Sequence, residues 1–187
     1  MNILETERLI LRRFTLDDTA FILELLNTEG WIKYIGEKNV KTIDQAREYL
    51  ENGPLKSYRN NGFGLALVEL KVDHVPIGMC GLISRNYLDH LDVGFAFLPN
   101  HTGHGYAFEI VKKTVEHAFV EFREEKVFAI TLPRNYSSIK LLTKVGFQYN
   151  KNFITPDTNE ELCLYSITRE DLEKATSIDL ASNAGRH

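Results

Sequence analysis

Apolar and polar positions alternate along the chain with two different periods, and the change of period predicts its elements. Over 7–14 the alternation is loose and predicts an opening strand. Apolar runs at 62–71, 77–84 and 91–98, separated by short polar turns, predict a meander of antiparallel strands. Apolar residues then recur every three or four positions from 106 to about 122, which predicts an amphipathic helix.

Capping signals locate two further helices ahead of the meander. Thr15 followed by Asp18, and Thr42 followed by Gln45, resemble boxes in which a hydroxyl and an acid or amide satisfy the free amides of a helix start. We expect the second of these helices to run to about Tyr58.

The rest of the chain predicts an α+β arrangement. The expected elements are a strand at 126–132, a helix at 135–145 between a capping Asn135 and Gly146, and a hairpin of 147–153 and 161–168. The tail over 169–187 loses apolar content, so we expect it to be flexible. The pattern therefore predicts one domain over 1–168 on a mixed sheet.

The composition of the chain argues against some classes of binding partner. The 187 residues suffice for one domain, and the formal net charge of −4 argues against a nucleic-acid partner while suiting a cationic substrate such as an amine. Cys80 and Cys163 lie in apolar runs, which favours buried free thiols in a reducing setting. The first residues carry charges and no apolar run is long enough to span a bilayer, so we expect a cytoplasmic protein without a membrane partner.

The stretch "PNHTGHGYAFE" at 99–109 joins a predicted strand to a predicted helix. A helix start carries free amides and a positive dipole end, and glycines at 103 and 105 would let an anion such as a diphosphate reach them. The P-loop pattern is absent, and Gly-x-Gly-x-x-Gly fails because Phe108 stands at its last position. From the turn alone, a diphosphate site and a plain strand-to-helix turn both stay open.

The flanking sequence is similar to a known superfamily. The turn, the apolar strand before it and "NYSSIKLLTKVGF" further on together resemble the GNAT superfamily of acetyl-CoA-dependent N-acetyltransferases. The opening "ETERLILRRFTLDD" resembles the RimJ/RimL-like branch, the ribosomal-protein N-terminal acetyltransferases, and the resemblance covers roughly 5–168. Two positions depart from the pattern: Thr102 replaces a basic or amide residue, and His104 stands where lysine is common.

The resemblance implies a fold and a cofactor site. The fold is a mixed, mostly antiparallel central sheet flanked by about four helices, with strand 91–98 splayed from its parallel neighbour 126–132 at the cofactor cleft. The acetyl-CoA co-substrate would contact the backbone of Phe95, Ala96 and Phe97, the amides of Thr102, Gly103, His104, Gly105, Tyr106 and Ala107, and the side chains of Asn135 and Ser138. Trp31 and Tyr34 would wall the acceptor pocket, with ordinary core packing as the alternative.

Direct transfer to an amine needs a base, and Asp92 is our candidate. It interrupts an apolar strand at a place where relatives often carry glutamate, and burial there would raise its pKa. A structural ion pair is the alternative role for Asp92, and Glu69 and His90 are weaker candidates for the base.

The departing thiolate needs an acid or a hydrogen bond. Many superfamily members supply a tyrosine at the position of Leu142, so Ser138 is the better candidate here and Tyr136 the reserve. A capping or surface hydroxyl is the alternative for Ser138. Glu109 matches the "YAxE" of the branch and is expected to brace the helix.

These inferences lead to an acetyl-CoA-dependent N-acetyltransferase whose acceptor is a protein or peptide N-terminal α-amine. The rivals are a small-molecule acetylase, for a polyamine, amino sugar or amino acid, and a catalytically weak acyl-CoA-binding module. We expect no metal, because His101, His104 and His117 lack a carboxylate or cysteine at ligand spacing. Many relatives dimerise, and the residues leave a homodimer open.

Overall fold

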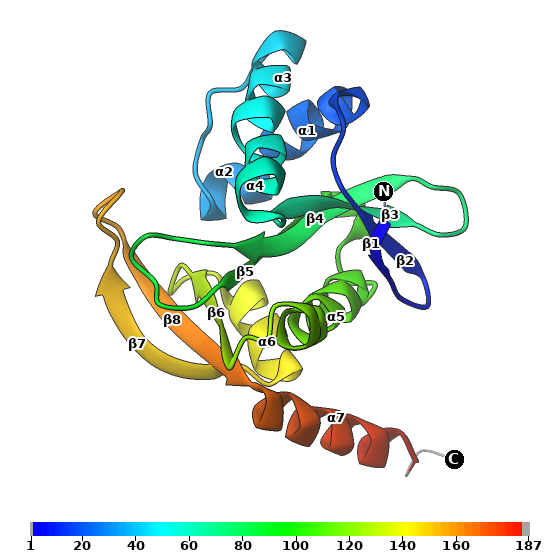
Figure 1. Ribbon diagram of the computed structural model, residues 1–187, viewed down its shortest axis with the longest axis vertical. Coiled ribbons are helices and arrows are strands. Elements are labelled where there is room, and N and C mark those ends of the chain that lie inside the picture. The colour runs from blue at the N-terminus through cyan, green and yellow to red at the C-terminus, as the bar shows by residue number, and fades with distance from the viewer. Residues whose placement is uncertain (1, 185–187) are drawn as a thin grey trace. The chain divides into compact units, whose positions relative to one another are not determined.

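The computed structural model describes residues 2–184 and contains the predicted meander and helices (Figure 1). It divides into two compact units, Met1–Ile83 with Gly94–Thr114, and Ser84–Val93 with Val115–His187. The prediction of one domain over 1–168 stays a prediction. None of the helices within the described residues has the length and apolar character needed to cross a membrane.

The first unit pairs its strands in the order β1, β2, β3, β4 and the latter part of β5. The bounds of these strands are β1 Asn2–Glu5, β2 Leu9–Arg12, β3 Leu65–Leu70, β4 Pro76–Ile83 and β5 Asp92–Phe97. The pairing from β1 to β4 is antiparallel, with Leu9 opposite Leu70 and Leu67 opposite Met79. The meander is therefore confirmed, and β1 is a strand that the hydrophobic pattern did not predict.

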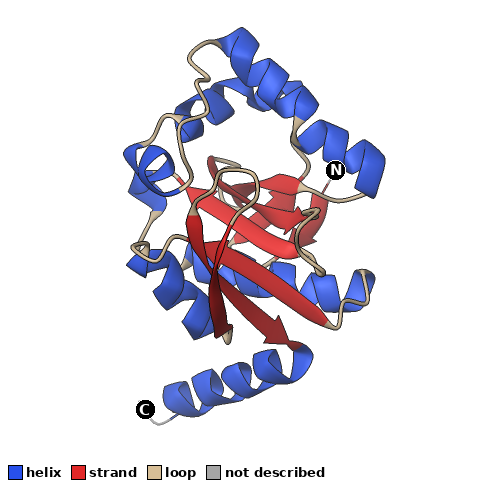
Figure 2. Ribbon diagram, turned by 90° about the vertical axis from the view of Figure 1, so that its left-hand side faces the viewer, coloured by secondary structure: helices blue, strands red, loops and turns tan. Residues whose placement is uncertain are grey.

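Four short helices lie against the sheet of this unit (Figure 2). They are α1 Thr19–Leu26, α2 Glu29–Tyr34, α3 Ile43–Asn52 and α4 Pro54–Asn61. Ile22, Leu25 and Leu50 from the helices form one buried cluster with Leu67 and Met79 from the strands. Burying large apolar side chains on both layers supplies most of the force that holds such a pair of layers together.

The two predicted capping boxes both form. The helix that begins after Thr42, however, ends at Asn52 instead of Tyr58. Gly53 and Pro54 break it, because proline has no amide to donate and a Cβ on Gly53 would lie 2.8 Å from the carbonyl oxygen of Tyr49. The predicted long helix is therefore wrong in this detail and is replaced by α3 and α4.

The second unit continues from the start of β5 in the order β5, β6, β8, β7. Its elements are β6 Lys126–Thr131, α6 Tyr136–Val145, β7 Gln148–Ile154, β8 Glu161–Thr168 and α7 Arg169–Ala184, and α5 Tyr106–Glu121 runs into it from the first unit. Asp92 pairs with Phe128 in parallel, and β6, β8 and β7 are antiparallel. The sheet is thus mixed and mostly antiparallel, as the resemblance implies.

The tail contains a helix that its composition does not predict, and its flexibility stays a prediction. Residues 169–184 form helix α7, and the remaining tail residues 185–187 lie outside the described part of the chain. Thr168 and Asp171 start this helix by reciprocal bonds, from the Thr168 amide to Asp171 Oδ2 (3.0 Å) and from the Asp171 amide to Thr168 Oγ1 (3.3 Å). Leu172 is buried. The cap and this apolar side chain therefore stabilise a helix in a segment whose composition does not predict one.

Candidate active site

The glycine turn lies between β5 and α5, after a single turn of 3-10 helix at Pro99–His101. Gly103 and Gly105 have φ angles of +80° and +82°, the left-handed region that glycine adopts without strain. The amide of Glu109 donates to Gly105 O (3.0 Å), so α5 begins at the glycine turn and its N-terminal end lies there. This exposed turn is therefore a positive helix end that can accept an anion.

The polar side chains of the turn bond to the turn itself. Thr102 Oγ1 donates to Pro99 O (2.8 Å), and His104 Nδ1 lies 2.8 Å from Thr102 O. The imidazole of His104 stacks on the ring of Tyr106, with centroids 5.6 Å apart. Thr102 thus supplies no charge to the turn, although the superfamily pattern favours a basic or amide side chain there.

Glu109 holds the turn against the start of β2. Its carboxylate accepts from Thr6 Oγ1 (2.5 Å), from the amide of Arg8 (2.9 Å) and from Arg8 Nε (2.7 Å). Burial raises the pKa of Glu109, but these hydrogen bonds outweigh it and leave the pKa below its ordinary value. Glu109 has the contacts of a brace, the role that the sequence predicts for it.

Phe95, Ala96 and Phe97 lie in the part of β5 that belongs to the first unit. Their neighbour there is β4, and the two backbones come so close that a Cβ on Gly78 would lie 2.6 Å from Ala96 O. Leu98 then donates its amide to Ile77 O (2.9 Å). Within this unit β5 is an edge strand, like β1, so an extended ligand could add to it.

Trp31 and Tyr34, the predicted acceptor residues, both lie in α2. Trp31 is buried in the core cluster, and its indole Nε1 has no hydrogen-bond partner among the described residues. Tyr34 is half-buried, with the ammonium of Lys33 5.0 Å from the centre of its ring. Trp31 therefore packs as a core residue. Its unpaired indole N–H is unusual, because a buried N–H normally finds a hydrogen-bond partner.

Asp92 is a buried carboxylate of the second unit, with 1% of its surface exposed. Arg85 Nε lies 2.9 Å from Oδ1, and Oδ2 has no partner among the residues that the structure describes. Burial raises the pKa of Asp92 to about 6, against the opposing effect of Arg85. A carboxylate with such a pKa and one free oxygen has the properties of a general base near neutral pH.

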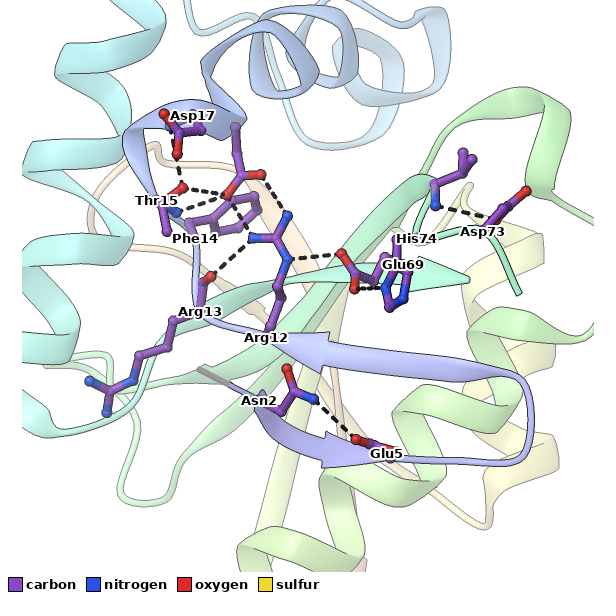
Figure 3. Close-up of polar contacts among 12 residues, drawn as sticks. Asn2, Glu5, Arg12, Arg13, Phe14, Thr15, Asp17, Glu69, Asp73 and His74 are labelled. Atoms are coloured by element: carbon purple, nitrogen blue, oxygen red, sulfur yellow. Dashed lines mark hydrogen bonds and ion pairs between the residues drawn. The ribbon is translucent and has the colours of Figure 1, made fainter. Parts of the chain in front are cut away.

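The alternative bases have other partners. In Figure 3 the carboxylate of Glu69 lies between Arg12 and His74, with Oε2 2.8 Å from Arg12 Nε and Oε1 2.8 Å from His74 Nδ1. Both oxygens of Glu69 are therefore occupied. His90 Nδ1 lies 3.4 Å from Glu124 Oε2, and the imidazole ring packs edge-on against the ring of Phe128.

Asn135 and Ser138 stand at the start of α6, in the second unit. Asn135 Oδ1 accepts from the amide of Ser138 (3.2 Å), so the asparagine caps the helix as predicted and keeps its amide NH2 as a donor. Ser138 is half-buried, whereas Tyr136, the reserve acid, is 77% exposed. Leu142 is fully buried, so the position where relatives carry tyrosine packs in the core here.

Arg8 and Arg85 are contacts of the candidate site that the sequence reasoning missed. Arg8 reaches the glycine turn from about a hundred positions away in the chain, and Arg85 lies in a polar turn that looks like a simple connection. The predicted residues themselves fall in both units, with the glycine turn, β5 and α2 in the first and Asp92, Asn135 and Ser138 in the second. Within residues 2–184, no group of three or more histidine, cysteine, aspartate or glutamate residues gathers as a metal site.

Comparison with known proteins identifies the family. The model of the acetyltransferase (GNAT) domain matches residues 8–148. The uncharacterized N-acetyltransferase YoaA of Bacillus subtilis (strain 168) is 28% identical over 148 residues, 78% of this chain and 82% of its own. The uncharacterized N-acetyltransferase p20 of Bacillus licheniformis is 29% identical over 152 residues, 79% of this chain and 83% of its own.

A solved structure agrees in fold. The GNAT-family acetyltransferase of Bacillus anthracis superposes with a TM-score of 0.75 at 24% identity, covering 91% of this chain and 99% of that one. The chain therefore belongs to the GNAT acetyltransferase family, and its activity is N-acetyl transfer to an amine. The family fold implies that acetyl-CoA is the acetyl donor, and the chemistry of the glycine turn fits the diphosphate of that cofactor.

Proposed function

We propose that acetyl-CoA binds with its diphosphate on the amides of Thr102–Ala107 and its pantetheine arm along Phe95–Phe97. The observation that carries this proposal is the pair of left-handed glycines, Gly103 and Gly105, in front of α5. A diphosphate there meets the positive end of a helix and the backbone of the glycine turn, in which the amide of Thr102 already donates to Pro99 O (3.2 Å). The amide NH2 of Asn135 and the hydroxyl of Ser138 supply further contacts to the same cofactor.

Three residues of the chain have separate roles in the proposed reaction. When bound, acetyl-CoA supplies an acetyl group activated as a thioester. Asp92, with a pKa of about 6, is mostly ionised at neutral pH and takes a proton from the amine, directly or through water. The amide of Phe95 is our candidate hydrogen-bond donor to the thioester oxygen, and the hydroxyl of Ser138 donates a hydrogen bond to the departing thiolate.

The acceptor that we propose is the N-terminal α-amine of a protein or peptide. The proposal rests on the opening "ETERLILRRFTLDD" and the turn "TGHGYAFE", which resemble the RimJ/RimL-like branch. Of the two predicted acceptor residues on α2, Tyr34 is the one that keeps part of its surface exposed, whereas Trp31 is buried in the core cluster. A cytoplasmic location and a homodimer are parts of this proposal that come from the sequence and the family.

Isothermal titration calorimetry of acetyl-CoA into the protein tests the cofactor site. We expect micromolar binding that Gly105→Glu abolishes, because a carboxylate and a side chain both block the diphosphate. Gly62→Glu is the matched control, since Gly62 has the same left-handed backbone (φ +81°) with nothing within 4 Å of its Cβ and lies at the end of α4. No binding to the folded wild-type protein would contradict the proposal.

Acceptor choice is tested separately by mass spectrometry of products from one mixture of peptides, polyamines, amino sugars and amino acids. Acetylation of peptide N-termini alone is the expected result. Acetylation of the small amines alone would contradict the proposed acceptor and leave the cofactor site intact. Binding of acetyl-CoA with no turnover of any amine would favour an acyl-CoA-binding module. The buried Leu142, at the position where many relatives carry a tyrosine, is the feature that suggests this alternative.

A further inference from the structure

Arg8 is a cation at the glycine turn that does not belong to the turn's own sequence. It lies just before β2, and its guanidinium reaches across to the loop in front of α5. Nη1 donates to His104 O (3.1 Å), and the guanidinium carbon lies 4.5 Å from the centre of the Tyr106 ring. One side chain therefore fixes both the middle of the turn and the first residue of the helix.

The orientation of Arg8 is set by Glu109. Nε lies 2.7 Å from Glu109 Oε2, and the backbone amide of Arg8 donates to Oε1 of the same carboxylate. Of the guanidinium nitrogens, Nε is thus bonded to Glu109 and Nη1 to the turn, and Nη2 lies beside Gly105. No hydrogen bond engages Nη2 within the described part of the chain, and Nη2 would lie 3.4 Å from a Cβ on Gly105. The side chain is 44% exposed, so a ligand at Gly105 can reach this nitrogen.

A cation at the turn would offset the negative charge of Glu109, which otherwise opposes the binding of an anion. The carboxylate of Glu109 lies close to the helix start, where it would repel a diphosphate. Thr102, which stands at the position of the family's basic or amide residue, directs its hydroxyl to Pro99 O instead. Arg8 both neutralises Glu109 and presents a planar donor of the kind that suits phosphate oxygens.

We infer that Arg8 is a cofactor-binding residue of this chain, whose Nη2 donates to a diphosphate oxygen of acetyl-CoA while Nη1 holds the turn. This inference rests on the proposed function of the glycine turn. Arg8 thereby takes the place of the charge that Thr102 does not carry. The chain would reach the same chemistry with a residue 96 positions earlier in the sequence than His104.

The test compares Arg8→Gln with Arg8→Lys by calorimetric titration of CoA, a readout that needs no turnover. We expect Arg8→Gln to weaken CoA binding about 10- to 100-fold, the effect of losing a charge-assisted hydrogen bond, and Arg8→Lys to weaken it less. Arg13→Gln is the matched control. Arg13 makes the same kinds of contact, to Gly62 O (2.8 Å) and over the ring of Tyr58 (4.9 Å), away from the glycine turn.

Two further readouts separate direct contact from a bracing role. A direct contact with charged oxygens is screened by salt, so the salt dependence of the CoA dissociation constant should be shallower in Arg8→Gln than in the wild type. The same fold loss is expected with 3′-dephospho-CoA, since the diphosphate is retained. A loss that disappears with 3′-dephospho-CoA, or one that leaves the salt dependence unchanged, would overturn the inference.

The outcomes also separate this inference from the proposed function. CoA binding that Gly105→Glu abolishes but Arg8→Gln leaves within about twofold would overturn the role of Arg8 alone. Absence of CoA binding in the folded wild type would overturn the proposed cofactor site and the inference with it. Circular dichroism and the urea midpoint of each variant establish that a lost affinity is not a lost fold.

Discussion

Replacing Asp92 by asparagine should change how the stability of the protein depends on pH. Asparagine keeps the size of the side chain and cannot ionise. Burial raises the pKa of Asp92 from its ordinary value of 3.8 to about 6 in the folded protein, so the folded state binds this proton more tightly than the unfolded state does. The stabilising contribution of Asp92 is therefore complete below the unfolded pKa and is lost as the pH rises through about 6.

The size of the effect follows from the two pKa values. A difference of about two units corresponds to about 3 kcal/mol of unfolding free energy between acid and neutral pH. Within the window between the two values the slope is about 1.4 kcal/mol per pH unit. The ion pair with Arg85 forms as Asp92 ionises, and its opposing effect is already included in the pKa of about 6.

Urea unfolding followed by circular dichroism, at several values from about pH 4.5 to pH 7.5, measures the free energy of each protein. The wild type should lose stability relative to Asp92→Asn as the pH rises. Asp89→Asn, which removes an exposed carboxylate in the same connection between β4 and β5, controls for the loss of a charge. A difference independent of pH would refute the reasoning, and a wild type that gains stability with pH would show that Arg85 outweighs burial.

Further predictions concern catalysis and the buried ion pairs. The kcat/KM of the wild type should rise with pH to a plateau above about 6, and Asp92→Asn should lower that plateau about 100-fold or more; an unchanged profile would exclude Asp92 as the base. Ser138→Ala should lower kcat about 10-fold or more with a smaller effect on the CoA dissociation constant, measured by steady-state kinetics and calorimetry, and equal losses would assign Ser138 to binding only. Arg12→Met should destabilise the fold by about 3–5 kcal/mol in urea unfolding, because it leaves the buried carboxylates of Asp18 and Glu69 without their shared partner; a loss below about 1 kcal/mol would contradict this.

Local signals account for the parts of the fold that the sequence predicted well. The box of Thr42 and Gln45 and the cap on Asn135 are contacts between neighbours in the chain, so residue type and spacing suffice to find them. The break at Gly53 and the helix after Thr168 carry equally local signals, a Gly-Pro pair and a further capping box, which the apolar pattern alone does not reveal.

The candidate site depends on contacts that no local pattern contains. Arg8 and Glu109 are 101 positions apart, and only the pairing of strands and the start of α5 bring them together. Arg85 meets Asp92 because the connection after β4 folds back on β5. The conformation of the glycine turn could be predicted because glycine spacing indicates a left-handed backbone, whereas the charges around the turn depend on tertiary structure.

Nuclear magnetic resonance of the 15N-labelled protein during titration with CoA tests the central claim most directly. The account predicts that the amides of Gly103, Gly105 and Ala107 show the largest shifts, because they would bond the diphosphate, and that Phe95 to Phe97 shift with them. Binding that leaves the amides of the glycine turn unmoved while shifting another region would contradict the account.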